Sequence, residues 1–252
     1  MLNNYITYCM TCSLIGLLTE NNEIVESKQL FSSYQTSVAD FDKCFSNMFS
    51  LDYSIVFGNE PKNRFLYNLL KEYYHNDFFI RYSFINKVLS KSEAVSFEEF
   101  PIGNSRVDLA SINGKSVAYE IKSEYDNYER LEKQIDDYSK CFEYVYVICP
   151  KSKIKCIKKH LPDYCGIYAY AGGSNIRFKV YKKAEHSPNV SAKQMILSLR
   201  IIDLKKAFST SNYENILVSY SEQRINSAFK SILKTRFKDK WEMLKEEAQL
   251  LN

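Results

Sequence analysis

The spacing of apolar side chains changes from a helical period to a strand period near residue 90. Apolar residues recur at intervals of three and four after Pro61, which suits the first position of a helix. A second helix is expected near Phe78–Leu89. The period then becomes two, which predicts three short strands. These strands are Val95–Phe100, Arg106–Ile112 and Ser116–Ile121.

An amphipathic helix and a fully buried strand follow. The apolar stripe of this helix consists of Tyr128, Leu131, Ile135, Tyr138 and Phe142. The run Tyr144–Ile148 is continuously apolar, which is typical of a strand covered on both faces, and Pro150 ends it. A short basic helix is expected over Lys151–His160.

The last third of the chain predicts a hairpin and then helices. Gly166–Ala171 and Ile176–Tyr181 have strand patterns around Gly172-Gly173. Two helices are expected after Ser191. The chain therefore divides into an N-terminal helical region (1–57), an α/β core with a basic extension (58–183) and a helical C-terminal region (184–252).

Charge and composition narrow the range of partners. The net charge is +4, but nine Lys or Arg residues and one Asp lie between Lys151 and Lys183. This basic block favours a polyanion such as nucleic acid. No apolar run approaches the length of a membrane span, and no basic residue precedes the apolar patches near the start. The seven cysteines fit a reducing compartment, so we expect a cytoplasmic protein without membrane contact.

Three charged residues on two predicted strands are the candidates for chemistry. Glu120 and Lys122 lie on the same face of their strand, because side chains alternate with a period of two. Whether Asp108 joins them depends on the turn between the strands. A two-residue turn at Asn113-Gly114 would place Asp108 on the opposite face.

A three-residue loop brings the two acids together. With Ile112-Asn113-Gly114 as the loop, and Gly114 in the left-handed conformation, Ala118 faces Asp108 and Arg106 faces Glu120. Asp108 and Glu120 are then diagonal neighbours on one face. Two carboxylates on rigid strands are hard oxygen ligands suited to Mg²⁺.

The residues around these strands resemble the PD-(D/E)XK nuclease superfamily, and more narrowly its sce7726-like family. The similarity covers roughly residues 60 to 150. Its motifs read R-x-D, E-I-K-S, D, R-L, Q and Y, and they correspond here to Arg106, Asp108, Glu120-Ile121-Lys122-Ser123, Asp126, Arg130-Leu131, Gln134 and Tyr138. The resemblance implies a restriction-endonuclease-like core, in which a mixed β-sheet is flanked by helices.

The resemblance also implies roles for individual residues. Asp108 and Glu120 would bind Mg²⁺, with Mn²⁺ as an alternative, and Lys122 would act at the nucleophile. A further acid from the first core helix would complete the metal site, and Glu60 is the candidate, with Glu72 as the alternative.

Other positions would support this centre. Gln134 would contact the substrate or orient a water, while Tyr138 would pack in the core. Glu99 would lie beside the metal ligands. Arg106 would bind phosphate or pair with Glu120. Nucleic acid would also contact the lysines of the basic block, namely Lys151, Lys153, Lys155, Lys158 and Lys159.

The sequence therefore predicts a magnesium-dependent nuclease that hydrolyses phosphodiester bonds, with DNA as the favoured substrate. Members of this superfamily also act in phage or mobile-element defence, which is the expected setting. Two alternatives stay open: a ribonuclease with the same residues, and a catalytically silent nucleic-acid-binding or regulatory module of the same fold. The apolar stripe of the last helix would pack within the chain or in a homodimer.

Overall fold

The computed structural model describes residues 29–30, 32–33, 37–49, 52–57, 62–73 and 75–250. These residues form two compact units. One consists of the described residues up to Phe79 together with Leu250, and the other is Ile80–Gln249.

The first unit is helical around an aromatic core. It contains α3 (Val38–Phe49), α4 (Tyr53–Phe57) and α5 (Lys62–Tyr73). Phe65 of α5 lies 5.5 Å from the ring of Phe45 in α3, so α5 belongs with the helices before it. For this reason the unit extends beyond the border predicted at residue 57.

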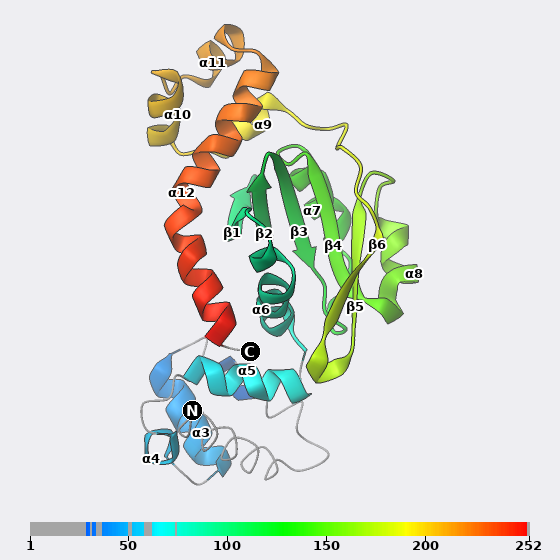
Figure 1. The fold of residues 1–252 in the computed structure, drawn as a ribbon, viewed down its shortest axis with the longest axis vertical. Coiled ribbons are helices and arrows are strands. Elements are labelled where there is room, and N and C mark those ends of the chain that lie inside the picture. The colour runs from blue at the N-terminus through cyan, green and yellow to red at the C-terminus, as the bar shows by residue number, and fades with distance from the viewer. Residues whose placement is uncertain are drawn as a thin grey trace. The chain divides into compact units, whose positions relative to one another are not determined.

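A six-stranded mixed sheet forms the centre of the second unit (Figure 1). The strand order along the sheet is the order along the chain. The first three strands are antiparallel, β3, β4 and β5 are parallel, and β6 is antiparallel to β5. The strands are β1 (Val95–Ile102), β2 (Ser105–Asn113), β3 (Lys115–Ile121), β4 (Tyr144–Pro150), β5 (Gly166–Ala171) and β6 (Arg177–Lys182). The predicted α/β class and mixed sheet are confirmed.

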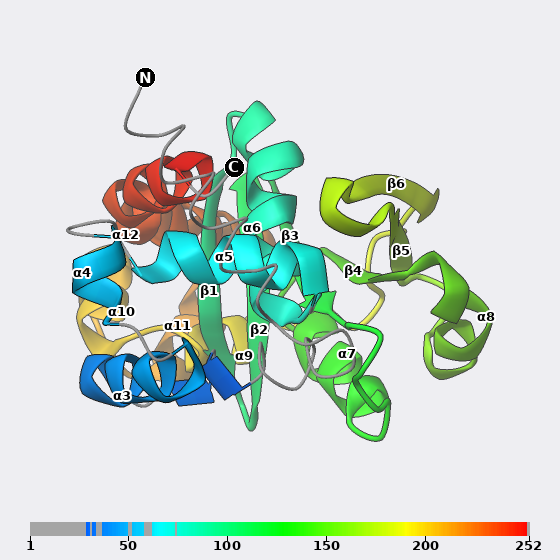
Figure 2. The same ribbon diagram turned by 90° about the horizontal axis from the view of Figure 1, so that it is seen from below.

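Helices cover both faces of this sheet (Figure 2). On one face lies α6 (Asp77–Lys87), whose Phe84 ring is 5.2 Å from the rings of Tyr119 and Tyr168. On the other face lie α7 (Leu131–Ser139) and α8 (Ile154–Ile157). The predicted basic helix is thus a series of short turns, because 3₁₀ turns flank α8. The 3₁₀ helices are η1 (Leu89–Lys91), η2 (Lys151–Lys153), η3 (Lys158–His160) and η4 (Gly173–Asn175).

The C-terminal region has four helices where the sequence predicted two. They are α9 (Ala192–Leu197), α10 (Ile201–Phe208), α11 (Tyr213–Ser219) and α12 (Glu222–Leu250). Side-chain caps divide the shorter ones: Ser191 accepts from the backbone N–H of Gln194, and Asn212 from that of Asn215.

The longest helix joins the C-terminal region to the sheet. α12 runs beside β1 (Figures 1 and 2), and the ring of Phe237 stacks on that of Phe97 at 4.3 Å. Phe229 packs at 6.0 Å from Phe142. The border predicted at residue 183 therefore does not separate two units. No helix in the described part of the chain is both long and apolar enough to cross a membrane.

Candidate active site

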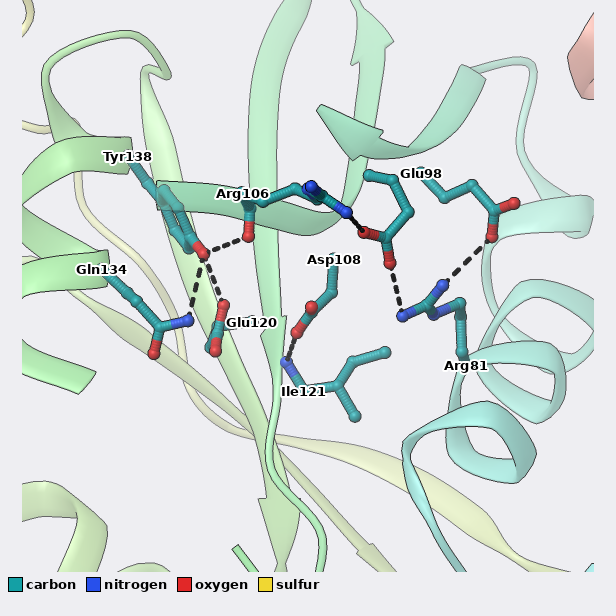
Figure 3. Close-up of polar contacts among 9 residues, drawn as sticks. Arg81, Glu98, Arg106, Asp108, Glu120, Ile121, Gln134 and Tyr138 are labelled. Carbon is teal, nitrogen blue, oxygen red and sulfur yellow. Dashed lines mark hydrogen bonds and ion pairs between the residues drawn. The ribbon is translucent and has the colours of Figure 1, made fainter. Parts of the chain in front are cut away.

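The two predicted acids meet where β2 and β3 diverge. The register pairs Asn113 with Lys115 and Leu109 with Tyr119, so by extension Asp108 stands opposite Glu120. Beyond Leu109 the carboxylate of Asp108 replaces the backbone as partner, because its Oδ2 accepts the N–H of Ile121 at 2.7 Å. Figure 3 shows this bond.

The turn between β2 and β3 differs from both predicted forms. Gly114 has φ +69°, as the three-residue loop requires, but the register is two residues away from the predicted pairing of Asp108 with Ala118. Contacts from outside the hairpin hold its turn end. Ser116 is fixed at the start of β3 because its N–H donates to Glu143 at 2.8 Å and its Oγ accepts the N–H of Glu143 at 3.0 Å. The two acids share a face as expected, and they are opposite each other rather than diagonal.

Asp108 is mostly buried, and its surroundings disfavour its charge. Burial raises the pKa of the carboxyl well above its usual value, and the nearby charge of Glu120 raises it further. The hydrogen bond from Ile121 and the charges of Arg81 and Lys122 oppose this shift.

Glu120 is buried, with 1% of its surface exposed, yet both of its oxygens have partners. Lys122 Nζ lies 2.7 Å from Oε1, and the hydroxyl of Tyr138 donates to Oε2 at 2.7 Å. Burial raises the pKa of Glu120, while the charge and hydrogen bond of Lys122 lower it. The two facing carboxyls therefore lie close together where water solvates them poorly. Ionisation of one makes ionisation of the other less favourable.

Helix α7 supplies polar side chains to one of the two acids, Glu120, and to its partner Lys122. Figure 3 shows Gln134 and Tyr138 beside Glu120. Gln134 Oε1 accepts from Lys122 Nζ at 3.1 Å, so the glutamine fixes the lysine. Tyr138 lies in the core, and its hydroxyl also contacts the carbonyl oxygen of Arg106 at 2.6 Å. Gln134 and Tyr138 reach the same place because they are four residues apart on one helix face.

A second polar network lies beside Asp108. The guanidinium of Arg81 on α6 is 2.8 Å from Glu99 and 3.4 Å from Glu98. Arg106 pairs with Glu99 at 3.3 Å rather than with Glu120. Glu99 has a φ of 55°, a backbone conformation that is rare for residues other than glycine. Such strained residues cluster at functional sites.

Sequence reasoning missed Arg81. No motif marks this residue, and its relation to Asp108 depends on how α6 packs on the sheet. The available signal combines two features: Arg81 lies on the last α-helix before β1, and β1 carries the two acids that Arg81 contacts, Glu98 and Glu99.

The chemistry of these donors fits a divalent cation. The two facing carboxylates supply hard oxygen ligands, and a cation between them would relieve their mutual repulsion. Glu60 lies outside the described residues, and so does the side chain of its alternative, Glu72. Among the side chains that the structure describes, no group of three or more His, Cys, Asp or Glu residues could hold a metal. Mg²⁺ would thus take its remaining ligands from water, substrate or residues outside the described part.

The predicted nucleic-acid-binding lysines differ in their exposure and in their contacts. Lys151, Lys155, Lys158 and Lys159 are exposed. Lys153 lies 3.8 Å from Glu124, which partly offsets its charge. Tyr168 packs in the aromatic cluster around Phe84.

The fold and this site define an α/β protein with a six-stranded mixed sheet that carries a buried glutamate opposite a partly buried aspartate. The model of the bacteriophage P4 protein cII family matches residues 67–250, and the chain belongs to this family. The matched stretch includes Asp108, Glu120, Lys122 and Gln134, whereas Glu60 precedes it.

One relative is similar over part of its length. Protein cII of Enterobacteria phage P4 is 32% identical over 95 residues, which cover 36% of this chain and 36% of that protein. The match thus spans about a third of the length of that relative. No solved structure matches significantly.

Proposed function

We propose that this protein is a magnesium-dependent nuclease with a restriction-endonuclease-like core, and that it hydrolyses phosphodiester bonds of DNA. The observation that carries the proposal is the placement of the partly buried Asp108 opposite the buried Glu120, with the pKa of both carboxyls raised. Such an arrangement costs stability, and perturbed acids of this kind concentrate at functional sites.

The order of elements also supports the proposal. A helix (α6), three antiparallel strands, a helix (α7) and a parallel strand (β4) follow one another, and they form a mixed sheet flanked by helices, which is what the resemblance to the PD-(D/E)XK superfamily implies. The acids lie near the end of β3, beside the parallel part of the sheet.

The residues of the chain would divide the work. A bound Mg²⁺ would supply a Lewis acid that polarises a phosphoryl oxygen and lowers the pKa of a water. Lys122, held by Glu120 and Gln134, would orient the attacking water or stabilise the charge that develops on the phosphorus oxygens. Tyr138 would hold Glu120 in place through its hydroxyl.

The direct test is cleavage of linear and circular duplex DNA and of single-stranded DNA, each with Mg²⁺, Mn²⁺ or EDTA. We expect divalent-dependent products from the wild-type protein and none from Asp108→Asn. The matched control is Asp136→Asn, because Asp136 is exposed on α7 and pairs only with the neighbouring Lys140 among its described contacts. Equal cleavage by wild type and Asp108→Asn would refute the proposal.

A silent nucleic-acid-binding or regulatory module is the second candidate. It is favoured by the lack of a third metal-ligating side chain among those described. Such a module would bind DNA in a salt-sensitive manner and release no products with any divalent ion. Cleavage of RNA alone, lost in Asp108→Asn, would instead identify a ribonuclease.

The proposal extends to the setting and the assembly of the nuclease. The similar protein cII belongs to a phage, so a phage or mobile element is the first place to look for its role. Defence against such elements and assembly as a homodimer belong to the proposal.

A further inference from the structure

A groove separate from the two acids runs along the last hairpin of the sheet. Its volume is about 850 Å³, and it lies between the segment of η2 and α8 and the strands β5 and β6. Its lining includes four cations, an exposed aromatic ring and two alanines. The cations are Lys151, Lys155, Arg177 and Lys179, and the ring belongs to Tyr181.

The charge of this groove is of one sign. Lys151 and Lys155 stand on one wall and Arg177 and Lys179 on the other, and all four are exposed. None of the described residues that line the groove is acidic. Two rows of cations that face a common channel suit a chain of phosphates.

The apolar lining distinguishes a single strand from a duplex. Tyr181 is 57% exposed and lies at the irregularity where β6 shifts its register on β5. Ala169 pairs with Lys179 and Ala171 with Arg177, so each of these cations has a small neighbour on β5 that leaves space beside it. An aromatic ring can stack on an unpaired base, whereas the base faces in a duplex are already stacked on each other.

The groove also adjoins the candidate active site. Because β3, β4 and β5 are parallel, their carboxyl ends lie at one edge of the sheet, where Lys122 and Lys151 follow their strands. The hydroxyl of Tyr170, a groove residue, donates to the carbonyl oxygen of Lys122 at 3.4 Å. Ser152 Oγ donates to Glu124 in the loop after β3 at 2.6 Å.

We propose that this groove binds a single-stranded polynucleotide and leads it toward Asp108 and Glu120. The binding step stands by itself, while delivery to the acids rests on the proposed nuclease function. The substrate would then be a nucleic acid with an unpaired segment, rather than a continuous duplex.

Binding in EDTA tests the groove without cleavage. The probes are a fluorescein-labelled oligothymidylate longer than about 16 nucleotides, the upper site size of a single-strand module, and a duplex of equal length. Their anisotropy is followed over a range of salt concentrations. An oligouridylate of the same length shows whether RNA can replace DNA in the groove.

Two variants remove the two kinds of contact. We expect Arg177→Glu/Lys179→Glu to weaken oligothymidylate binding by about tenfold or more and to reduce the slope against salt by about 1.4, for two lost phosphate contacts. Tyr181→Ala should weaken it by about five- to thirtyfold with little change in the salt slope.

The matched control is Lys205→Glu/Lys206→Glu, since both lysines are exposed on α10 and do not line the groove. It should bind like the wild type. If the double charge reversal lowers the melting temperature, Arg177→Gln/Lys179→Gln replaces it.

The outcomes separate the two proposals. Equal or tighter binding of the duplex, or wild-type affinity in both groove variants, would overturn the proposal that the groove binds a single strand. Tight binding of oligouridylate that the groove variants lose would support it, with RNA as the strand. If binding depends on the groove but no divalent ion supports cleavage, the groove proposal stands and the nuclease proposal is rejected.

Discussion

Two buried glutamate–lysine pairs lie near the two ends of β3, and the pKa shifts of their glutamates have opposite signs. Glu120 contacts Lys122 at 2.7 Å, and Glu143 contacts Lys230 at 2.8 Å. The exposed fraction is 1% for Glu120 and 8% for Glu143. The pKa of the first carboxyl is raised and that of the second is lowered.

The neighbours explain the difference. Burial acts to raise the pKa of Glu143, but hydrogen bonds from Lys230, the Ser116 backbone and Asn226 outweigh it. The Asn226 amide is 2.8 Å away, and Lys230 also donates to the carbonyl oxygen of Gly114 at 2.8 Å. Glu143 thus links the β2–β3 turn to α12 as a structural residue.

The pair at the candidate site lacks this balance. Its acid faces a second acid, Asp108, whose own burial and proximity to Glu120 raise its pKa. A cluster with two neighbouring acids is less favourable for folding than a balanced ion pair. Such a cluster persists where function requires it. The comparison therefore distinguishes a pair kept for stability from one proposed for chemistry.

The largest expected effect is on cleavage. Lys122→Ala should lower the cleavage rate by about 10²- to 10⁴-fold, because it removes the cation proposed to act in the transition state. Lys230→Ala is the matched variant, since each lysine contacts one buried glutamate. Measured below its melting temperature, Lys230→Ala should cleave like the wild type. Wild-type rates in Lys122→Ala would remove Lys122 from the mechanism.

The second prediction compares the same two lysine variants by their stability, and here the larger effect is expected at Lys230. Lys230→Ala should lower the free energy of unfolding by about 3 kcal/mol, because it leaves Glu143 buried without its counter-ion. Lys122→Ala should cost less, since Glu120 keeps the Tyr138 hydroxyl and its raised pKa lets it take up a proton. Urea unfolding near neutral pH measures both. A larger loss in Lys122→Ala would show that the site pair also holds the fold.

Sequence reasoning predicted the sheet better than the site. Alternation and apolar runs are local properties, so the strands from Val95 to Lys182 and the shared face of Glu120 and Lys122 could be read directly. The register at Asp108 could not, because contacts from outside the hairpin hold its turn end, such as that of Ser116 with Glu143, 27 residues away. Local turn rules contain no information on such a contact.

The helical parts show the same limit. The number of C-terminal helices depended on caps such as Ser191 and Asn212, which are polar residues common in loops as well. Arg81 could not be predicted as a neighbour of Asp108, since only the packing of α6 brings them together. The pairing of Arg106 with Glu99 likewise depends on the left-handed residue in β1.

The third prediction is that a variant of the candidate site gains stability while it loses the proposed activity. Asp108→Asn should raise the free energy of unfolding by about 1 kcal/mol near pH 8, because the amide can still accept the Ile121 N–H and carries no charge. For an acid with a raised folded-state pKa, the cost of its charge is present above that pKa and vanishes as the pH falls below the usual value. The gain should therefore shrink toward pH 4. A gain that is constant with pH would mean that the charge of Asp108 is not its cause.

The smallest expected effect concerns Glu143 and has the opposite sign. A carboxyl with a lowered folded-state pKa contributes stability that is present above its usual pKa and is lost as the pH falls through the folded-state value. Glutamine retains an oxygen for the Ser116 N–H but cannot carry the charge that Lys230 pairs with. The difference in unfolding free energy between wild type and Glu143→Gln should thus decrease by about 1 kcal/mol when the pH falls from the neutral range to below the usual pKa of glutamate. Chemical unfolding of both proteins along this range measures it. Because Asp108→Asn gains stability at high pH and Glu143→Gln loses it there, two curves that run in parallel would contradict the distinction between the two acids.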